Sequence, residues 1–294
     1  MFSVMRQAPK LITPASSTPR VIKKVSDIDD QEGLRHHVQF LFFYKNNPSP
    51  AMKGKDPVQV IREPLSRALV FYCPLAGRLK EAMNRKFVVD WTGEGVLFIE
   101  ADANVKLEHF GDEIQVPCPY LNQLLYKVLG SEGIVDCPLL SIQVTRLVCG
   151  GFNLGLRFNH AMCDGFGLQK FAKAVEEMTR DDNENVRICR YCPRQAFQQA
   201  YTSRISWKHH CSPGCLFKGG RFVQESIRIG GRSSADYMVI KERPKCSTEG
   251  NFFISDLTPL GFEEVDLGWG QPIYAGPTEA TSFISYCVKY IKRD

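Results

Sequence analysis

A histidine and an aspartate stand four residues apart in the segment HAMCDG, where they are His160 and Asp164. Imidazole has an ordinary pKa of about 6.5, so at neutral pH it is largely unprotonated and can accept a proton from a hydroxyl group. The carboxylate of Asp164 either contacts the imidazole or turns away and holds the loop through an arginine. Gly165 and Gly167 permit the tight backbone that such a loop requires. The pair therefore indicates a general base or, alternatively, a buried histidine satisfied by backbone groups.

The residues before the histidine alternate in the way that a β-strand requires. Between Phe152 and Asn159 every even-numbered residue is large and apolar, and every odd-numbered residue is polar or glycine. Because side chains alternate between the two faces of a strand, the even-numbered face is predicted to be buried. One further residue of strand would put His160 on that inward face. Two glycines at 150–151 predict a hairpin with a strand over 140–148.

Further elements follow from similar signals. A helix is predicted to begin at Asp56-Pro57, a capping residue followed by proline in the first turn. Pro64 conflicts with this helix, because a proline inside a helix costs about 3 kcal/mol. Apolar residues at helical spacing after the histidine predict a helix that ends near Arg180. The remaining predicted elements are strands over 34–44, 87–90 and 96–99, a short amphipathic helix over 120–128, and ordered segments over 235–240, 251–257, 262–270 and 282–290.

Composition favours a soluble globular protein, because 44% of the 294 residues are hydrophobic and 23% are charged. The longest strongly apolar run, Val38–Tyr44, is far shorter than the roughly 20 residues of a membrane-spanning helix. The N-terminus has no apolar signal core. Eleven scattered cysteines without such a signal are typical of reduced thiols. A cytoplasmic protein without a transmembrane helix is therefore predicted.

Two features of the middle of the chain have alternative interpretations. Cysteines and histidines between Cys189 and Cys215 have the residue types and spacing of a zinc site, but no periodic core surrounds them, so an accidental cluster is preferred. From Arg180 to Lys245 thirteen Lys or Arg stand against six Asp or Glu. This excess suits the phosphates of CoA or of a nucleic acid, but a solvated linker is preferred. Neither a metal site nor nucleic-acid binding is predicted.

Two other candidate groups receive ordinary interpretations. Cys163 lies between His160 and Asp164 and suggests a Cys-His nucleophile, but a packing or loop role is preferred. The tandem His36-His37 is interpreted as alternation between surface and core, not as a ligand pair.

Several motifs place the histidine in a known family. HAMCDGFG resembles the HxxxDG motif of the plant BAHD acyltransferases, and the segment DLGWG at 266–270 resembles their DFGWG motif, with Leu267 where phenylalanine is usual. The segment YCPLAGRL at 72–79 is similar to their YPLAGRL segment, and 89–96 is similar to the stretch before their first long strands. The opening of the chain and the segment GEGVLFIEADANV look closest to the alcohol acyltransferase branch, especially benzyl alcohol O-benzoyltransferases.

The resemblance implies a fold and a reaction. The fold would be mixed α/β, of the two-lobed chloramphenicol acetyltransferase-like type. A benzoyl or related group would move from acyl-CoA to a small alcohol to form an ester. His160 would take the alcohol proton, and Asp164 would support the loop with its carboxylate held by an arginine. The remaining motif residues would be architectural, namely Gly165, Asp266, Gly268, Trp269 and Gly270.

The same resemblance implies few partners. Acyl-CoA would be a co-substrate, with no permanently bound cofactor or metal. The protein would act as a monomer, without a nucleic acid or a membrane.

The chain departs from the family after Arg180. Family members carry a long crossover and much of a second lobe there, and they also extend beyond the position of Asp294. The absent part would supply most of the CoA-binding surface and the arginine for Asp164. Three regions are therefore predicted: an acyltransferase lobe over 1–180, an irregular basic connector over 181–234, and a remnant of the second lobe over 235–294. A catalytically inactive remnant or interaction protein is the alternative function.

Overall fold

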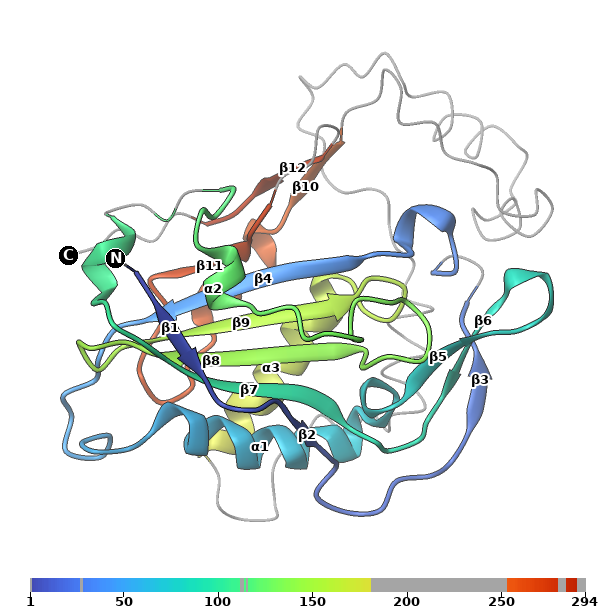
Figure 1. The fold of residues 1–294 in the computed structure, drawn as a ribbon, viewed down its shortest axis with the longest axis horizontal. Helices are drawn as coiled ribbons and strands as arrows, with labels where there is room; N and C mark the ends of the chain where they lie inside the picture. The colour runs from blue at the N-terminus through green and yellow to red at the C-terminus, as the bar shows by residue number, and fades with distance from the viewer. Residues whose placement is uncertain are drawn as a thin grey trace.

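The computed structural model describes residues 2–26, 29–111, 114, 116–180, 253–279 and 284–289. Its main feature is a seven-stranded sheet with the order β1-β7-β8-β9-β4-β11, in which β2 also pairs with β7 (Figure 1). The strands are β1 (Val4–Arg6), β2 (Lys10–Ile12), β4 (His37–Tyr44), β7 (Val96–Ala103), β8 (Leu140–Arg146), β9 (Phe152–Asn159) and β11 (Tyr274–Pro277).

Two smaller sheets and three helices complete the described fold. A three-stranded sheet has the order β3-β6-β5, and β10 pairs with β12 in parallel. These strands are β3 (Ile22–Lys24), β5 (Arg78–Glu81), β6 (Phe87–Asp90), β10 (Phe253–Asp256) and β12 (Ile284–Cys287). The helices are α1 (Pro57–Phe71), α2 (Leu121–Leu124) and α3 (Gly165–Arg180).

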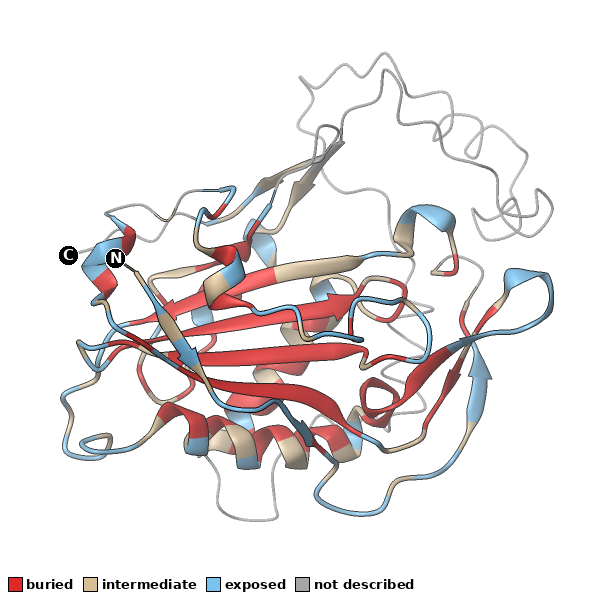
Figure 2. Cartoon of the chain, in the orientation of Figure 1, coloured by how far each residue is buried: buried red, intermediate tan, exposed pale blue. Residues whose placement is uncertain are grey.

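The predicted hairpin is confirmed, since β8 and β9 pair antiparallel with Leu140 opposite Phe158. The even-numbered side chains of β9 join one hydrophobic cluster with α1 and α3, as predicted. The odd-numbered side chains are buried as well, which the alternation did not indicate. Figure 2 shows β7, β8 and β9 buried along most of their length. The reason is a covering segment: a Cβ atom added at Gly155 would lie 2.7 Å from the Leu124 carbonyl oxygen.

Helix α1 begins where the sequence predicts it. The Asp56 side chain accepts a hydrogen bond from the Val58 amide at 3.2 Å and caps the helix. The expected conflict at Pro64 does not end the helix, which continues to Phe71. Packing explains this outcome, because each buried side chain such as Ile61 or Leu65 contributes about 2 kcal/mol, and several together outweigh one proline.

Three predicted boundaries differ from the observed ones by three residues or more, and the strand predicted over 140–148 ends at Arg146. The strand predicted from residue 34 begins at His37, because Glu32–Leu34 forms a 3₁₀ turn. The strand predicted over 96–99 extends to Ala103. The helix predicted over 120–128 ends at Leu124. Its continuation is prevented by the buried Gln143, whose side chain accepts a hydrogen bond from the Tyr126 amide and donates one to the Gln123 carbonyl, both at 2.8 Å.

The C-terminal part of the described chain is built into the same sheet and core. Strand β11 pairs with β4, so Pro277 lies opposite Phe40. The Tyr44 hydroxyl donates a hydrogen bond of 3.0 Å to the Val265 carbonyl. Residues 262–269 contribute four side chains to the cluster that contains α1 and α3.

Within the described ranges, no helix is long and apolar enough to cross a membrane, and no group of three or more His, Cys, Asp or Glu is placed to hold a metal ion. The Cys189–Cys215 cluster, the basic connector and the segment predicted over 235–240 lie outside the described residues.

Candidate active site

His160 lies immediately after β9, where a tight turn ends the strand. The Asn159 carbonyl accepts a hydrogen bond from the Met162 amide, and the Asn159 side chain accepts one from the Ala161 amide, both at 3.0 Å. The His160 amide still donates to the His36 carbonyl at 2.9 Å, which holds the residue against the start of β4. His160 is therefore half-buried at the end of the sheet and does not continue the strand.

The His160 imidazole is suited to accept a proton. Its Nδ1 atom is buried and has no hydrogen-bond partner. Burial lowers the pKa of His160, because a charged ring loses solvation; its own backbone carbonyl and the charge of Asp164 oppose this change. The ring is consequently neutral at neutral pH, which is the form that a general base requires.

Asp164 supports the turn and does not bind the imidazole. Its Oδ1 atom accepts a hydrogen bond of 2.8 Å from the Gly167 amide, and its carbonyl accepts one of 2.9 Å from the Leu168 amide. The aspartate thereby caps the start of α3, of which Gly165 is the first residue. Among the residues that the structure describes, no arginine contacts Asp164, so the expected cation is not found there.

Cys163 is not arranged as a nucleophile. Burial raises the pKa of its thiol well above the usual value, and the carboxylates of Asp164 and Asp29 raise it further. The thiol therefore stays protonated at neutral pH, whereas a nucleophilic cysteine must be a thiolate. Its position in the turn agrees with the preferred packing role.

The DLGWG segment forms a structural clamp. Asp266 accepts hydrogen bonds of 2.8 Å from the amides of Gly268 and Gly270. These two glycines have φ values of 99° and 83°, which glycine adopts most readily. The other oxygen of Asp266 lies 3.3 Å from the Arg180 guanidinium at the end of α3.

The clamp is distant from His160. The Trp269 ring is buried and packs edge-on against Phe152, with ring centroids 5.1 Å apart. Phe152 and Asn159 are the two ends of β9. At about 3.3 Å per residue the motif lies roughly 20 Å from the histidine, a separation that agrees with the predicted architectural role.

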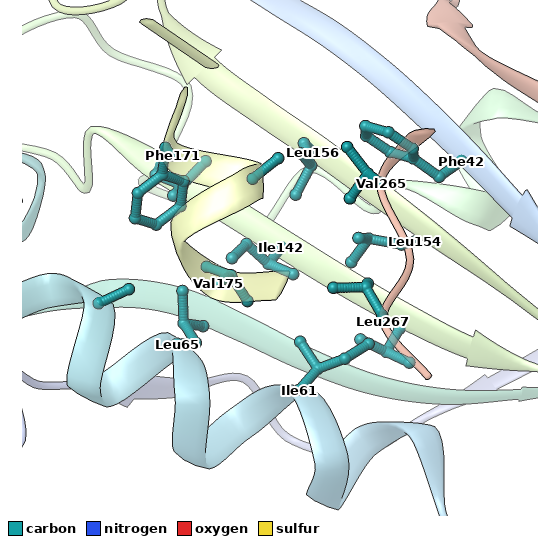
Figure 3. Packing of buried hydrophobic residues seen from close by; sticks show 14 of the residues in the cluster. Phe42, Ile61, Leu65, Ile142, Leu154, Leu156, Phe171, Val175, Val265 and Leu267 are labelled. Carbon is teal, nitrogen blue, oxygen red and sulfur yellow. The ribbon is translucent and has the colours of Figure 1, made fainter. Parts of the chain in front are cut away.

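A cavity of about 30 Å³ lies in the core between α1, α3 and the main sheet. Figure 3 shows apolar side chains that surround it from these elements and from the segment containing Val265 and Leu267. Such a volume holds about one water molecule, and none of the lining residues is polar. His160 does not line it. This cavity is therefore a packing defect and not a substrate site.

Sequence reasoning did not identify His36 as part of the site. The rings of His36 and His160 lie 5.2 Å apart between centroids and are tilted by 62°. The register of the strands is the missing signal: His37 pairs with Asn159, so the residues that flank this last pair are His36, just before β4, and His160, just after β9. Nothing in either local segment shows that these two strands are neighbours.

Comparisons with known proteins agree with this architecture. The model of the Transferase family matches residues 2–201. Alcohol acyl transferase 1 (allele RGb) of Malus domestica is 36% identical over 407 aligned positions, covering 99% of this chain and 89% of that protein. Benzyl alcohol O-benzoyltransferase of Petunia hybrida is 36% identical, covering 95% and 84%. The crystal structure of vinorine synthase superimposes with a TM-score of 0.65 at 19% identity, covering 97% of this chain and 91% of that one.

The chain therefore belongs to this Transferase family, the BAHD acyl-CoA-dependent acyltransferases that its motifs resemble. The predicted family, fold class and enzyme class are thereby confirmed. The alignment with the Malus protein spans 407 positions although this chain has 294 residues, so a substantial part of that relative has no counterpart here.

Proposed function

We propose that the chain transfers an acyl group from acyl-CoA to the hydroxyl group of a small alcohol, with His160 as the general base. The observation that carries this proposal is the neutral, half-buried imidazole at the end of β9, with a buried nitrogen that has no partner in the described structure. The names of the two plant relatives support the reaction class, since both are enzymes of alcohol acylation.

The proposed reaction needs one proton carrier. His160 removes the proton from the alcohol as its oxygen attacks the thioester carbonyl, which becomes a tetrahedral oxyanion. Collapse of this intermediate breaks the carbon–sulfur bond and releases CoA thiolate, which takes the proton back from the imidazolium. No acyl-enzyme is required, because the alcohol itself is the nucleophile. Asp164 contributes by capping α3 and fixing the turn that carries the base.

We further propose a benzoyl or related aromatic acyl group and a benzyl-type alcohol as substrates. The 36% identity to the Petunia benzoyltransferase supports this choice, as does the similarity of the motif segments. The test incubates the purified chain with benzoyl-CoA and benzyl alcohol and measures the ester. Activity in the wild type and its loss in His160→Ala are expected. His109→Ala, which changes an exposed histidine outside the site, is the matched control and should retain the wild-type rate.

An inactive family member is the second candidate. Two observations favour it. A substantial part of the relatives has no counterpart in this chain, and no arginine lies beside Asp164 in the described ranges. This candidate predicts no turnover with acetyl-, butyryl- or benzoyl-CoA and no heat of CoA binding in calorimetry. Ester formation that depends on His160 excludes it.

The proposal also includes the three predicted regions, over 1–180, 181–234 and 235–294. It further includes a monomeric state, a cytoplasmic location and no permanently bound cofactor. Light scattering on the purified chain tests its mass in solution, and elemental analysis tests for a metal.

A further inference from the structure

We propose that His36 is a positioning residue for His160, and that at most one of the two imidazole rings is an imidazolium at any time. This inference rests on the proposed function, because it assigns His36 a role that acts through the base. Its structural content, the coupling of two rings, can be tested without any turnover.

Two separate contacts join the residues. The His160 amide donates to the His36 carbonyl at 2.9 Å, one step beyond the last paired residues of β4 and β9. The His36 ring then meets the His160 ring at 5.2 Å with a 62° tilt, an edge-to-face geometry. The main-chain contact fixes the backbone of the base, and the ring contact limits the rotation of its side chain.

The pair cannot accept two protons easily. His36 is exposed as a residue, but the part of its ring that faces His160 is covered. This partial burial lowers the pKa of His36, His160 lowers it further, and a hydrogen bond with the Gly33 backbone opposes the change. Electrostatic coupling is reciprocal, so a charged His36 would equally disfavour the imidazolium of His160.

The neighbouring titratable group on β4 is His37, the first residue of that strand. His37 has a pKa lowered to about 4, chiefly by burial and also by Arg157, His36 and Lys127. Arg157 and Lys127 act on His37, and they are not among the groups that shift the pKa of His36 or of His160. His37 is itself neutral at neutral pH, and it contributes no charge there.

The groups on the α3 side favour one proton on His160. Asp164 is the charge that raises the pKa of His160 against the larger effect of burial. Beyond it lies Asp29, whose pKa is raised to about 6 by burial first and by Asp164 in addition, while Ser26 and Lys86 oppose this. The first proton therefore goes to His160, and His36 stays neutral while the base is transiently charged.

A histidine titration followed by nuclear magnetic resonance tests the coupling. In protein with isotope-labelled histidine, His160→Gln removes the neighbouring charge and should raise the pKa of His36 relative to the wild type. His109→Gln, a change at an exposed histidine outside the pair, should leave the titration of His36 unchanged. An unaltered His36 titration in His160→Gln overturns the coupling. The titration of His36 can be measured even on a protein that makes no ester. A negative result for the coupling is therefore distinguishable from a failure of the proposed function.

Kinetics test the positioning role. His36→Ala removes the ring contact and should lower kcat about tenfold with KM for both substrates nearly unchanged, because a poorly held base affects the chemical step more than binding. His36→Phe restores a ring of similar shape and should recover most of the loss. A wild-type kcat in His36→Ala, or no recovery in His36→Phe, overturns the positioning role.

Discussion

Asp56 and Arg146 form a bidentate ion pair that connects the start of α1 to the end of β8. The guanidinium donates through Nε at 2.6 Å to one carboxylate oxygen and through a terminal nitrogen at 2.7 Å to the other. The same carboxylate caps α1 through the Val58 amide. One side chain thus fixes the helix against the sheet and satisfies its first turn.

Replacing Asp56 should separate these two contributions. Asn is a good helix cap but carries no charge, so Asp56→Asn should lose only the ion pair, about 0.5 to 1 kcal/mol for a partly exposed pair. Asp56→Ala loses the cap as well and should cost about 2 kcal/mol. Chemical denaturation at pH 7 measures both. Equal stability of the two variants would show that the cap contributes nothing.

The ion pair should also make stability depend on pH. The hydrogen bonds from Arg146 hold the pKa of Asp56 below its usual value. A lowered folded-state pKa gives stability that is present above the unfolded-state pKa of about 3.9 and is lost as pH falls through the folded value. The difference in unfolding free energy between the wild type and Asp56→Asn should therefore shrink below pH 4. A difference that stays constant from pH 7 to pH 3 would contradict this.

Filling the core cavity should stabilise the protein. Leu267 lines the cavity of about 30 Å³ and stands where the family motif has phenylalanine. At about 24 cal/mol per Å³, Leu267→Phe should add about 0.7 kcal/mol, or roughly 2 °C in Tm. Leu267→Ala enlarges the void and should cost about 3 kcal/mol. A Tm below that of the wild type for Leu267→Phe would mean that the space is too narrow for the ring.

Breaking the Asp266 clamp should affect folding and leave the chemistry intact. Asp266→Ala leaves the amides of Gly268 and Gly270 without their acceptor, and should cost about 2 to 3 kcal/mol of unfolding free energy. Because the motif lies far from His160, kcat per folded molecule should stay within about twofold of the wild type. Unfolding curves measure the first quantity, and assays corrected for the folded fraction measure the second. A large fall in corrected kcat would place the clamp in the active site.

The pH profile of kcat/KM should report the environment of His160. Because burial lowers its pKa, the acid limb should lie below pH 6.5. The charge of Asp164 raises that pKa, so Asp164→Asn should move the limb to still lower pH, while the Asn oxygen can still cap α3. Initial rates from pH 4.5 to pH 8 decide this. A limb that moves to higher pH would mean that Asp164 does not act through its charge.

The sequence by itself determined the parts of this protein that depend on neighbouring residues. The glycine pair at 150–151 specified the β8-β9 hairpin, Asp56-Pro57 specified the start of α1, and the residues around His160 identified the family and pointed to the proposed base. Each of these follows from turn chemistry, capping or a contiguous motif, which act over a few residues.

Tertiary structure decided everything that requires a distant segment. The odd-numbered face of β9 is polar in sequence, yet it is buried because the segment around Leu124 covers it. The helix predicted over 120–128 is shortened because Gln143, from another strand, takes its backbone hydrogen bonds. His36 meets His160 only through the pairing of β4 with β9. Local patterns determine which secondary structure a segment can form. Long-range packing determines which segments it contacts, because burial depends on which surfaces meet.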